Sequence, residues 1–116
     1  MIKSRFQTYN HGVLYICESV ADDSDFRAVR NPRAHDDIVK IQKLDYSEVT
    51  KREQDLDFAE NAGKTLDFKV RTRYHGSATT DRQVLIGSDL YDIFQVDWDA
   101  DKTNMYLFLE KVRVLV

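Results

Sequence analysis

The chain has 116 residues, a formal net charge of -3 and 42% hydrophobic residues, which is enough apolar material for one modest core. This composition excludes a wholly disordered chain, and the acidic balance argues against bulk binding to nucleic acid. The sequence lacks a run of about 18 apolar residues and an apolar segment near its start, so we expect neither a membrane span nor secretion. We expect a single domain over residues 1–116.

The first part of the chain predicts two strands separated by a long loop. An apolar run predicts a strand over residues 12–18, and it contains the single cysteine, Cys17, which we interpret as a buried structural thiol. Residues 19–37 are polar and rich in aspartate and arginine. A loop of this length in a compact domain is usually functional or disordered. A weak alternation predicts a second strand over residues 38–44.

Residues 46–62 predict the one helix. Asp45 and Glu48 have the spacing of a capping box, and Gly63 supplies a left-handed stop after the last turn. Charged residues fill most of its surface, so we expect the helix to pack by one edge against a sheet. Its few apolar residues near one side are Val49, Leu56 and Ala59.

Residues 68–112 predict four consecutive strands. Apolar and polar positions alternate up to Tyr74, the pattern of a half-buried strand. The runs 84–86 and 90–98 flank a turn at Gly87-Ser88-Asp89 and should form a tight antiparallel pair. Residues 97–104 predict the next turn. The last run, 105–109, is apolar on both faces, so it should lie centrally or be covered on its outer side by another element or chain.

The alternation changes phase between Tyr91 and Trp98, which predicts a β-bulge or bend near Ile93-Phe94. Such a bend lets one strand contribute to both sides of a small closed sheet. The sequence therefore predicts a mainly β fold of the β-rich α+β type. We expect a small β-barrel of about six antiparallel strands, with one helix and long loops, and favour it over a sandwich.

The sequence predicts no catalytic, metal or cofactor site. Asp97, Asp99 and Asp101 have the alternate spacing of calcium ligands, but Lys102 and Phe108 stand where such a loop needs glycine and glutamate. We interpret the three aspartates as an acidic, solvated turn. The histidines have no partner at ligand spacing, and no base paired with a nucleophile can be named, so we expect the protein not to be an enzyme.

Basic residues gather on the polar face of the strand that begins near residue 68. Lys69, Arg71 and Arg73 share this face, and Arg82 belongs to the neighbouring strand. Two interpretations stay open for this basic patch. It is either a solvated face paired with acids such as Asp67, or a contact surface for an acidic partner or for passing DNA.

The order of sequence segments in the second half resembles the phage head closure family, also called the head-tail joining or head completion family. A basic strand ending in RTRYHG is followed by DRQVLI, a turn glycine, LYDIFQVDWD and an apolar strand ending in LEKV. The first half of the chain matches only loosely. Family members resemble one another mainly by strand and turn residues, so the resemblance implies a barrel fold and an assembly role without an active site. The matching positions are Arg73, Tyr74, Arg82, Val84, Gly87, Tyr91, Ile93 and Val96.

The resemblance implies a virion structural protein of the head-tail connector, or neck. Such a protein forms a homo-oligomeric ring, expected to be a dodecamer, below the portal and its adaptor. There it closes the DNA channel close to the packaged DNA and provides the docking surface for the tail proteins. Assembly would take place in the host cytoplasm and the mature location would be the virion; a monomer in solution is consistent with this role.

Two loops are the expected subunit and partner contacts, residues 19–37 and 75–81. Loops of this kind order when they meet a neighbour. The candidate contact residues are Asp22, Asp23, Asp25, Arg27, Arg30, Arg33, His75 and Arg82.

Two alternative functions stay open. A tail terminator or tail completion protein is also a small ring former, and sequence discriminates it poorly. A small barrel that binds single-stranded nucleic acid would use exposed aromatic rings as stacking platforms. Against the second alternative, these aromatics fall mostly on apolar faces and the net charge has the wrong sign. Its candidate rings are Tyr74, Tyr91, Phe94 and Trp98.

Overall fold

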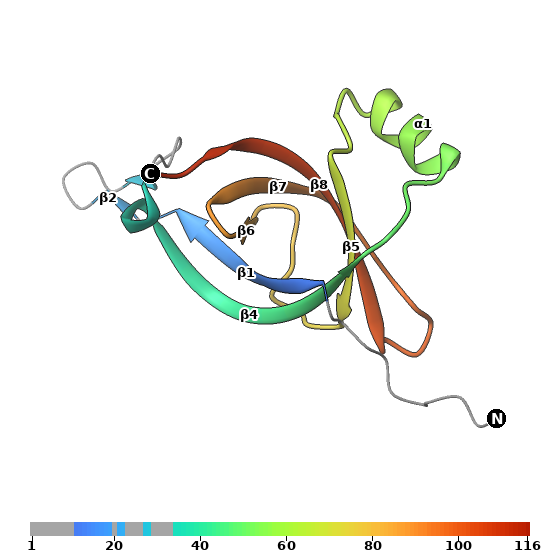
Figure 1. The fold of residues 1–116 in the computed structure, drawn as a ribbon, viewed down its shortest axis with the longest axis horizontal. Coiled ribbons are helices and arrows are strands. Elements are labelled where there is room, and N and C mark those ends of the chain that lie inside the picture. Colours follow the sequence, from blue (N-terminus) through green and yellow to red (C-terminus); the bar gives the residue numbers. More distant parts are fainter. Residues whose placement is uncertain (1–10, 20, 23–26, 29–33) are drawn as a thin grey trace.

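The computed structural model describes residues 11–19, 21, 22, 27, 28 and 34–116, and its main sheet is a closed antiparallel barrel (Figure 1). Around the barrel the strands follow the order β1-β4-β5-β8-β7-β6. The prediction of a mainly β fold, with six antiparallel strands and one α-helix in the described part, is confirmed. The barrel strands are β1 (Gly12–Ser19), β4 (Ile38–Glu48), β5 (Phe68–Arg73), β6 (Gln83–Ile86), β7 (Asp89–Trp98) and β8 (Asn104–Val114).

A small hairpin outside the barrel lies within the predicted loop 19–37. Its strands are β2 (Ala21–Asp22) and β3 (Arg27–Ala28), and the 3-10 turn η1 (His35–Asp37) then leads into β4. Asp22 and Arg27 pair across this hairpin. Four other predicted contact residues lie outside the described residues: Asp23, Asp25, Arg30 and Arg33.

One apolar cluster, here called the main core, fills the barrel. Because side chains on a strand alternate between its two faces, every second residue of each strand points inward. Thr72 of β5 is also fully buried. The main core includes Leu14, Ile16, Leu44, Tyr46, Val70, Val84, Tyr91, Ile93, Met105, Leu107 and Leu109.

The predicted bulge in β7 is confirmed. Against β8, Ile93 pairs with Leu109 and Gln95 pairs with Phe108, so Phe94 is the additional residue. The bulge changes which residues face inward: Ile93 belongs to the main core, while Phe94 packs outside the barrel. One strand thereby supplies apolar side chains to both sides of the sheet.

The predicted turns of the second half are also present. Ile86 pairs with Asp89, so Gly87 and Ser88 alone connect β6 to β7. Gly87 has φ 62°, a left-handed conformation that suits glycine at the first central position of a tight hairpin turn. β7 ends at Trp98 and β8 begins at Asn104, which agrees with the turn predicted over residues 97–104.

The predicted start of the helix is wrong. The helix α1 runs over Glu53–Asn61 and not over 46–62, because β4 continues past residue 44 to Glu48. Asp45 and Glu48 are therefore strand residues. The actual cap is Arg52, whose backbone N–H donates to the Asp55 carboxylate over 3.0 Å. The end of the helix was predicted correctly, since Gly63 has φ 70°.

α1 covers the outer face of β8, as the apolar character of 105–109 on both faces predicted. Met105, Leu107 and Leu109 face the main core. On the opposite face, Phe108 and Tyr106 pack in a second cluster with Ala59 and Leu66. This second cluster, together with Phe94, fixes the helix against β7 and β8.

A third cluster lies outside the β6–β7 hairpin and contains Cys17. The thiol is buried as predicted, and burial raises its pKa to about 11. Leu115 covers this cluster, and its backbone N–H donates to the carbonyl of Ser88 over 2.7 Å. The C-terminal residues thus close this side of the barrel.

Candidate interaction surface

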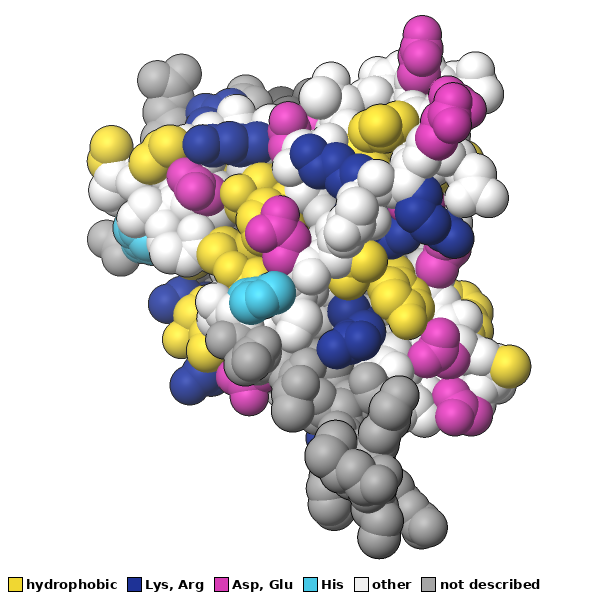
Figure 2. Space-filling view, turned by 45° about the vertical axis from the view of Figure 1, so that its right-hand side comes forward, with side chains coloured by type: hydrophobic (Ala, Val, Ile, Leu, Met, Phe, Trp, Pro, Cys, Tyr) yellow, Lys and Arg dark blue, Asp and Glu magenta, His cyan; other side chains and the backbone are white. Residues whose placement is uncertain are grey.

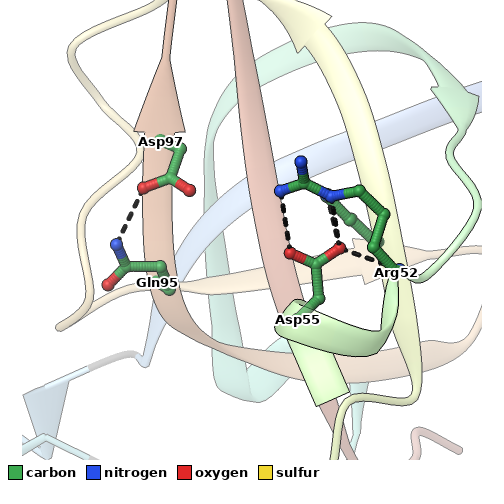
Figure 3. Close-up of polar contacts among 5 residues, drawn as sticks. Arg52, Asp55, Gln95 and Asp97 are labelled. Atoms are coloured by element: carbon green, nitrogen blue, oxygen red, sulfur yellow. Dashed lines mark hydrogen bonds and ion pairs between the residues drawn. The ribbon is translucent and has the colours of Figure 1, made fainter. Parts of the chain in front are cut away.

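A buried ion pair joins α1 to β5. Lys69 Nζ donates to Asp55 Oδ2 over 2.8 Å, and the two side chains are 5% and 4% exposed. Arg52 approaches the same carboxylate from the solvent side, donating from Nε over 3.2 Å and from Nη2 over 3.1 Å (Figure 3). Burial by itself raises the pKa of Asp55, but these hydrogen bonds outweigh it and leave that pKa well below its usual range.

The prediction that Lys69 belongs to a surface basic patch is wrong, because its side chain is buried. Its ammonium lies 5.0 Å from the ring centroid of Phe108 and 5.8 Å from that of Tyr106, beneath α1. The polar face of β5 is therefore partly an interior face, because the first turn of α1 brings Asp55 over it. Arg73 is exposed and Arg71 is half-buried, so the surface part of the patch is smaller than expected.

Arg82 does not lie on a strand next to β5, as was predicted, but in the loop that precedes β6, and it holds this loop in place. Its Nε donates to Glu18 of β1 over 2.8 Å, and its Nη1 donates to the carbonyl of Ser77 over 2.7 Å. His75 is exposed, and its Nδ1 accepts from the Ser77 backbone N–H over 3.1 Å. The guanidinium of Arg82 thus has partners within the chain, and of these two predicted contact residues His75 is the more accessible.

Asp97 lies near the end of β7 and Asp99 and Asp101 lie in the β7–β8 turn, and each accepts a local hydrogen bond. Asp97 accepts from Gln95 Nε2 over 2.8 Å, as Figure 3 shows. Asp99 accepts from Asn104 Nδ2 over 3.1 Å, and Asp101 accepts from the backbone N–H of Thr103 over 3.1 Å. In the described part of the chain, no group of three or more His, Cys, Asp or Glu could hold a metal ion.

An open groove of about 390 Å³ lies between the start of α1 and the β7–β8 turn. Trp98 borders it, is 52% exposed and meets Tyr74 edge to face at a centroid distance of 6.0 Å. The molecular face that carries α1 shows hydrophobic side chains between acidic and basic ones (Figure 2). The groove is lined by Val49, Arg52, Lys69, Asp97, Trp98 and Tyr106.

A second exposed apolar surface lies on β4. Val39 is 52% exposed and Ile41 is 39% exposed, and the exposed residues Lys40 and Lys43 flank them. β4 pairs with β5 only from Tyr46 to Glu48. Over residues 38–45 it therefore has β1 on one side and, among the described residues, no strand on the other.

The four rings considered for nucleic-acid stacking have different environments. Tyr91 belongs to the main core, and Tyr74 packs against it. Phe94 stacks on Phe58 and meets Phe108 edge to face. Trp98 is the one of the four that is mostly exposed. These rings therefore do not form the row of stacking platforms that binding of single-stranded nucleic acid requires.

No protein-family model matches this chain, and no curated protein is significantly similar to it. Within the described residues, no helix is long and apolar enough to cross a membrane.

Proposed function

We propose that this protein is a phage head closure protein, a virion structural protein that joins the filled head to the tail. In this role it forms a ring below the portal and adaptor, closes the DNA channel and presents the docking surface for the tail. The expectation that it is not an enzyme is part of the same proposal.

The observation that carries the proposal is the position of the residues behind the family resemblance. Val84, Tyr91 and Ile93 belong to the main core, and Tyr74 and Val96 pack against it. Gly87 forms the β6–β7 turn, and Arg82 fastens a loop to β1. The matching pattern therefore consists largely of the residues that build this barrel, which is what a resemblance in fold requires.

Two separate exposed apolar surfaces also support an assembly role. One is formed by Trp98 with the half-buried Tyr74 ring beside it, and the other consists of Val39 and Ile41. A ring is built from heterologous contacts, in which one surface of a subunit meets a different surface of the next. A protein that acts alone has less need of two such surfaces.

The direct test uses purified DNA-filled heads that lack this protein, examined by negative-stain microscopy with and without the protein added back. The expected result is that added protein restores DNA retention and tail joining. The matched control adds the same protein to tails in place of heads before mixing. Heads that already retain DNA, with a defect that is repaired only on the tails, would replace the proposal by the tail terminator function.

Deletion of residues 22–33 tests the role of the long loop. The described residues of this segment belong to no strand of the closed sheet, since β2 and β3 pair only with each other. We expect the deleted protein to keep the circular dichroism spectrum and cooperative unfolding of the barrel but to lose attachment to heads. Loss of folding would show that the segment is not dispensable for the barrel.

A further inference from the structure

The β7–β8 turn, with the last residues of β7, forms a projecting surface that the rest of the described chain covers only in part. The Tyr74 ring meets Trp98 there, and Lys102 of the turn lies 5.6 Å from the centroid of that ring. β6 pairs with β7 only from Asp89 to Asp92, so residues 93–98 have β8 on one side and no described strand on the other. Trp98 lies at the end of this stretch with more than half of its surface exposed. Exposed carboxylates at Asp97 and Asp101 flank it. This surface, the acidic tip, combines one large aromatic with negative charge.

The exposed stretch of β4 has the complementary composition. Val39 and Ile41 offer an apolar surface, and the charged side chains beside them, Lys40 and Lys43, are positive. Asp45, the acid of this stretch, lies near its end toward β5. Aromatic residues that bury against apolar neighbours provide much of the affinity of protein interfaces, while flanking charges select the partner. This surface is called the basic stretch.

We propose that the acidic tip of one copy of this chain docks on the basic stretch of the next copy. Trp98 packs on Val39 and Ile41. Asp97 lies against Lys43, and Asp101 lies against Lys40. The inference rests on the proposed function, because it names the contact that would build the ring. The occupant of each surface is a second copy of the chain, which carries the complementary charge.

The positions of the two surfaces fit this head-to-tail contact. In Figure 1 the basic stretch of β4 forms the lower left of the barrel, and the β7–β8 turn lies at the lower right. Contacts between two different surfaces of a subunit generate a ring when the rotation from each subunit to the next adds up to a full turn. A single self-complementary surface generates a dimer instead. A shallow hollow lined by Val96, Asp97 and Trp98 lies at the part of β7 that no described strand borders, and it leaves room for a neighbouring chain.

Charge exchange tests the contact. Lys43→Glu and Asp97→Lys should each reduce tail joining in the head add-back assay by about tenfold, because each brings like charges together. A chain that carries both substitutions has opposite charges again at every contact and should recover to within about threefold of the unaltered protein. Lys64→Glu, at an exposed residue after α1, is the matched control and should leave joining unchanged. Failure of the double variant to recover would overturn the proposal.

Disulfide trapping gives a second readout that does not depend on charge. A chain with both Ile41→Cys and Trp98→Cys should form a ladder of covalent multimers when assembled connectors are oxidised, whereas each single variant should not. Cys17 can stay, because it is buried. Dimers formed by Ile41→Cys alone would show that two β4 strands meet and would overturn the head-to-tail contact.

The two proposals fail in different ways. If unaltered protein joins heads to tails but neither charge recovery nor the ladder is found, the docking contact is wrong and the head closure function stands. If unaltered protein has no effect on heads, the head closure function is wrong. The ladder, measured then in concentrated purified protein, still decides whether copies dock through these surfaces.

Discussion

The outer faces of β8 and β4 both carry large apolar side chains, yet the chain covers them differently. On β8, Phe108 is buried and Tyr106 half-buried beneath α1. On β4, Val39 is 52% exposed and Ile41 is 39% exposed. Apolar residues under α1 contribute fully to the stability of the single chain, whereas the exposed parts of Val39 and Ile41 contribute only when another surface covers them. Substitutions should therefore separate stability from assembly.

Loss of the buried ammonium should have the largest effect on the covered face. We expect Lys69→Ala to lower the free energy of unfolding by about 3 kcal/mol, because it leaves the Asp55 carboxylate buried without its interior partner. Urea denaturation measures this directly. Lys64→Ala, at an exposed lysine, should stay within about 0.5 kcal/mol of the unaltered chain. An equal effect of both substitutions would mean that the ion pair does not fix α1.

Low pH should weaken the packing of α1 against the barrel. The pKa of Asp55 is below its ordinary value of 3.8, so its ionised form stabilises the folded chain fully above that pH. The contribution is lost as the pH falls below 3.8 toward the lower folded pKa. Thermal unfolding followed from about pH 5 to about pH 2 should show this loss. The variant with both Asp55→Asn and Lys69→Met should show a smaller decrease over that range, since it lacks the ionisable pair.

Removal of the Phe58 ring should have an intermediate effect. The ring stacks on Phe94 at a centroid distance of 6.4 Å and meets Phe108 edge to face at 6.2 Å, although it is 42% exposed. We expect Phe58→Ala to cost about 1.5 kcal/mol in urea denaturation. Leu56→Ala removes a similarly exposed side chain of α1 that belongs to none of the three clusters, and should cost about 0.5 kcal/mol.

Substitution on β4 should have the smallest effect on stability. Val39→Thr keeps a β-branched side chain at a position that is 52% exposed, so the free energy of unfolding should change by less than about 0.5 kcal/mol. Tail joining in the add-back assay should nevertheless fall. A large loss of stability would show that β4 is covered within the single chain, and the contrast between the two faces would disappear.

The second half of the fold was predictable because its signals are local. The turn at Gly87 requires a left-handed residue between two apolar runs, and the change of phase near Phe94 requires an additional residue. The start of the helix was not predictable in this way. Asp45 and Glu48 fit both a capping box and the polar face of a strand, and the contact of Tyr46 with Phe68, at 5.9 Å between centroids, favours the strand.

The candidate surfaces depended on contacts between distant residues. Nothing near Lys69 in the sequence shows that Asp55 will cover it, so the sequence alone predicts Lys69 as part of a basic patch. Arg52 and Trp98 border one groove only because the segment that leads into α1 lies beside the end of β7. The exposure of Val39 and Ile41 follows from the short overlap between β4 and β5, which depends on the register of the whole barrel.

The pairing of β1 with β6 also governs how the chain folds during synthesis. Tyr15 of β1 pairs with Leu85 of β6, so the barrel can close only after most of the polypeptide has been synthesised. β6, β7 and β8 are consecutive hairpins and can form quickly, whereas contacts of long sequence separation form slowly. Until the barrel closes, the side chains of Leu14 and Ile16 are not buried in the main core. We expect this intermediate to be the species that aggregates or engages a chaperone.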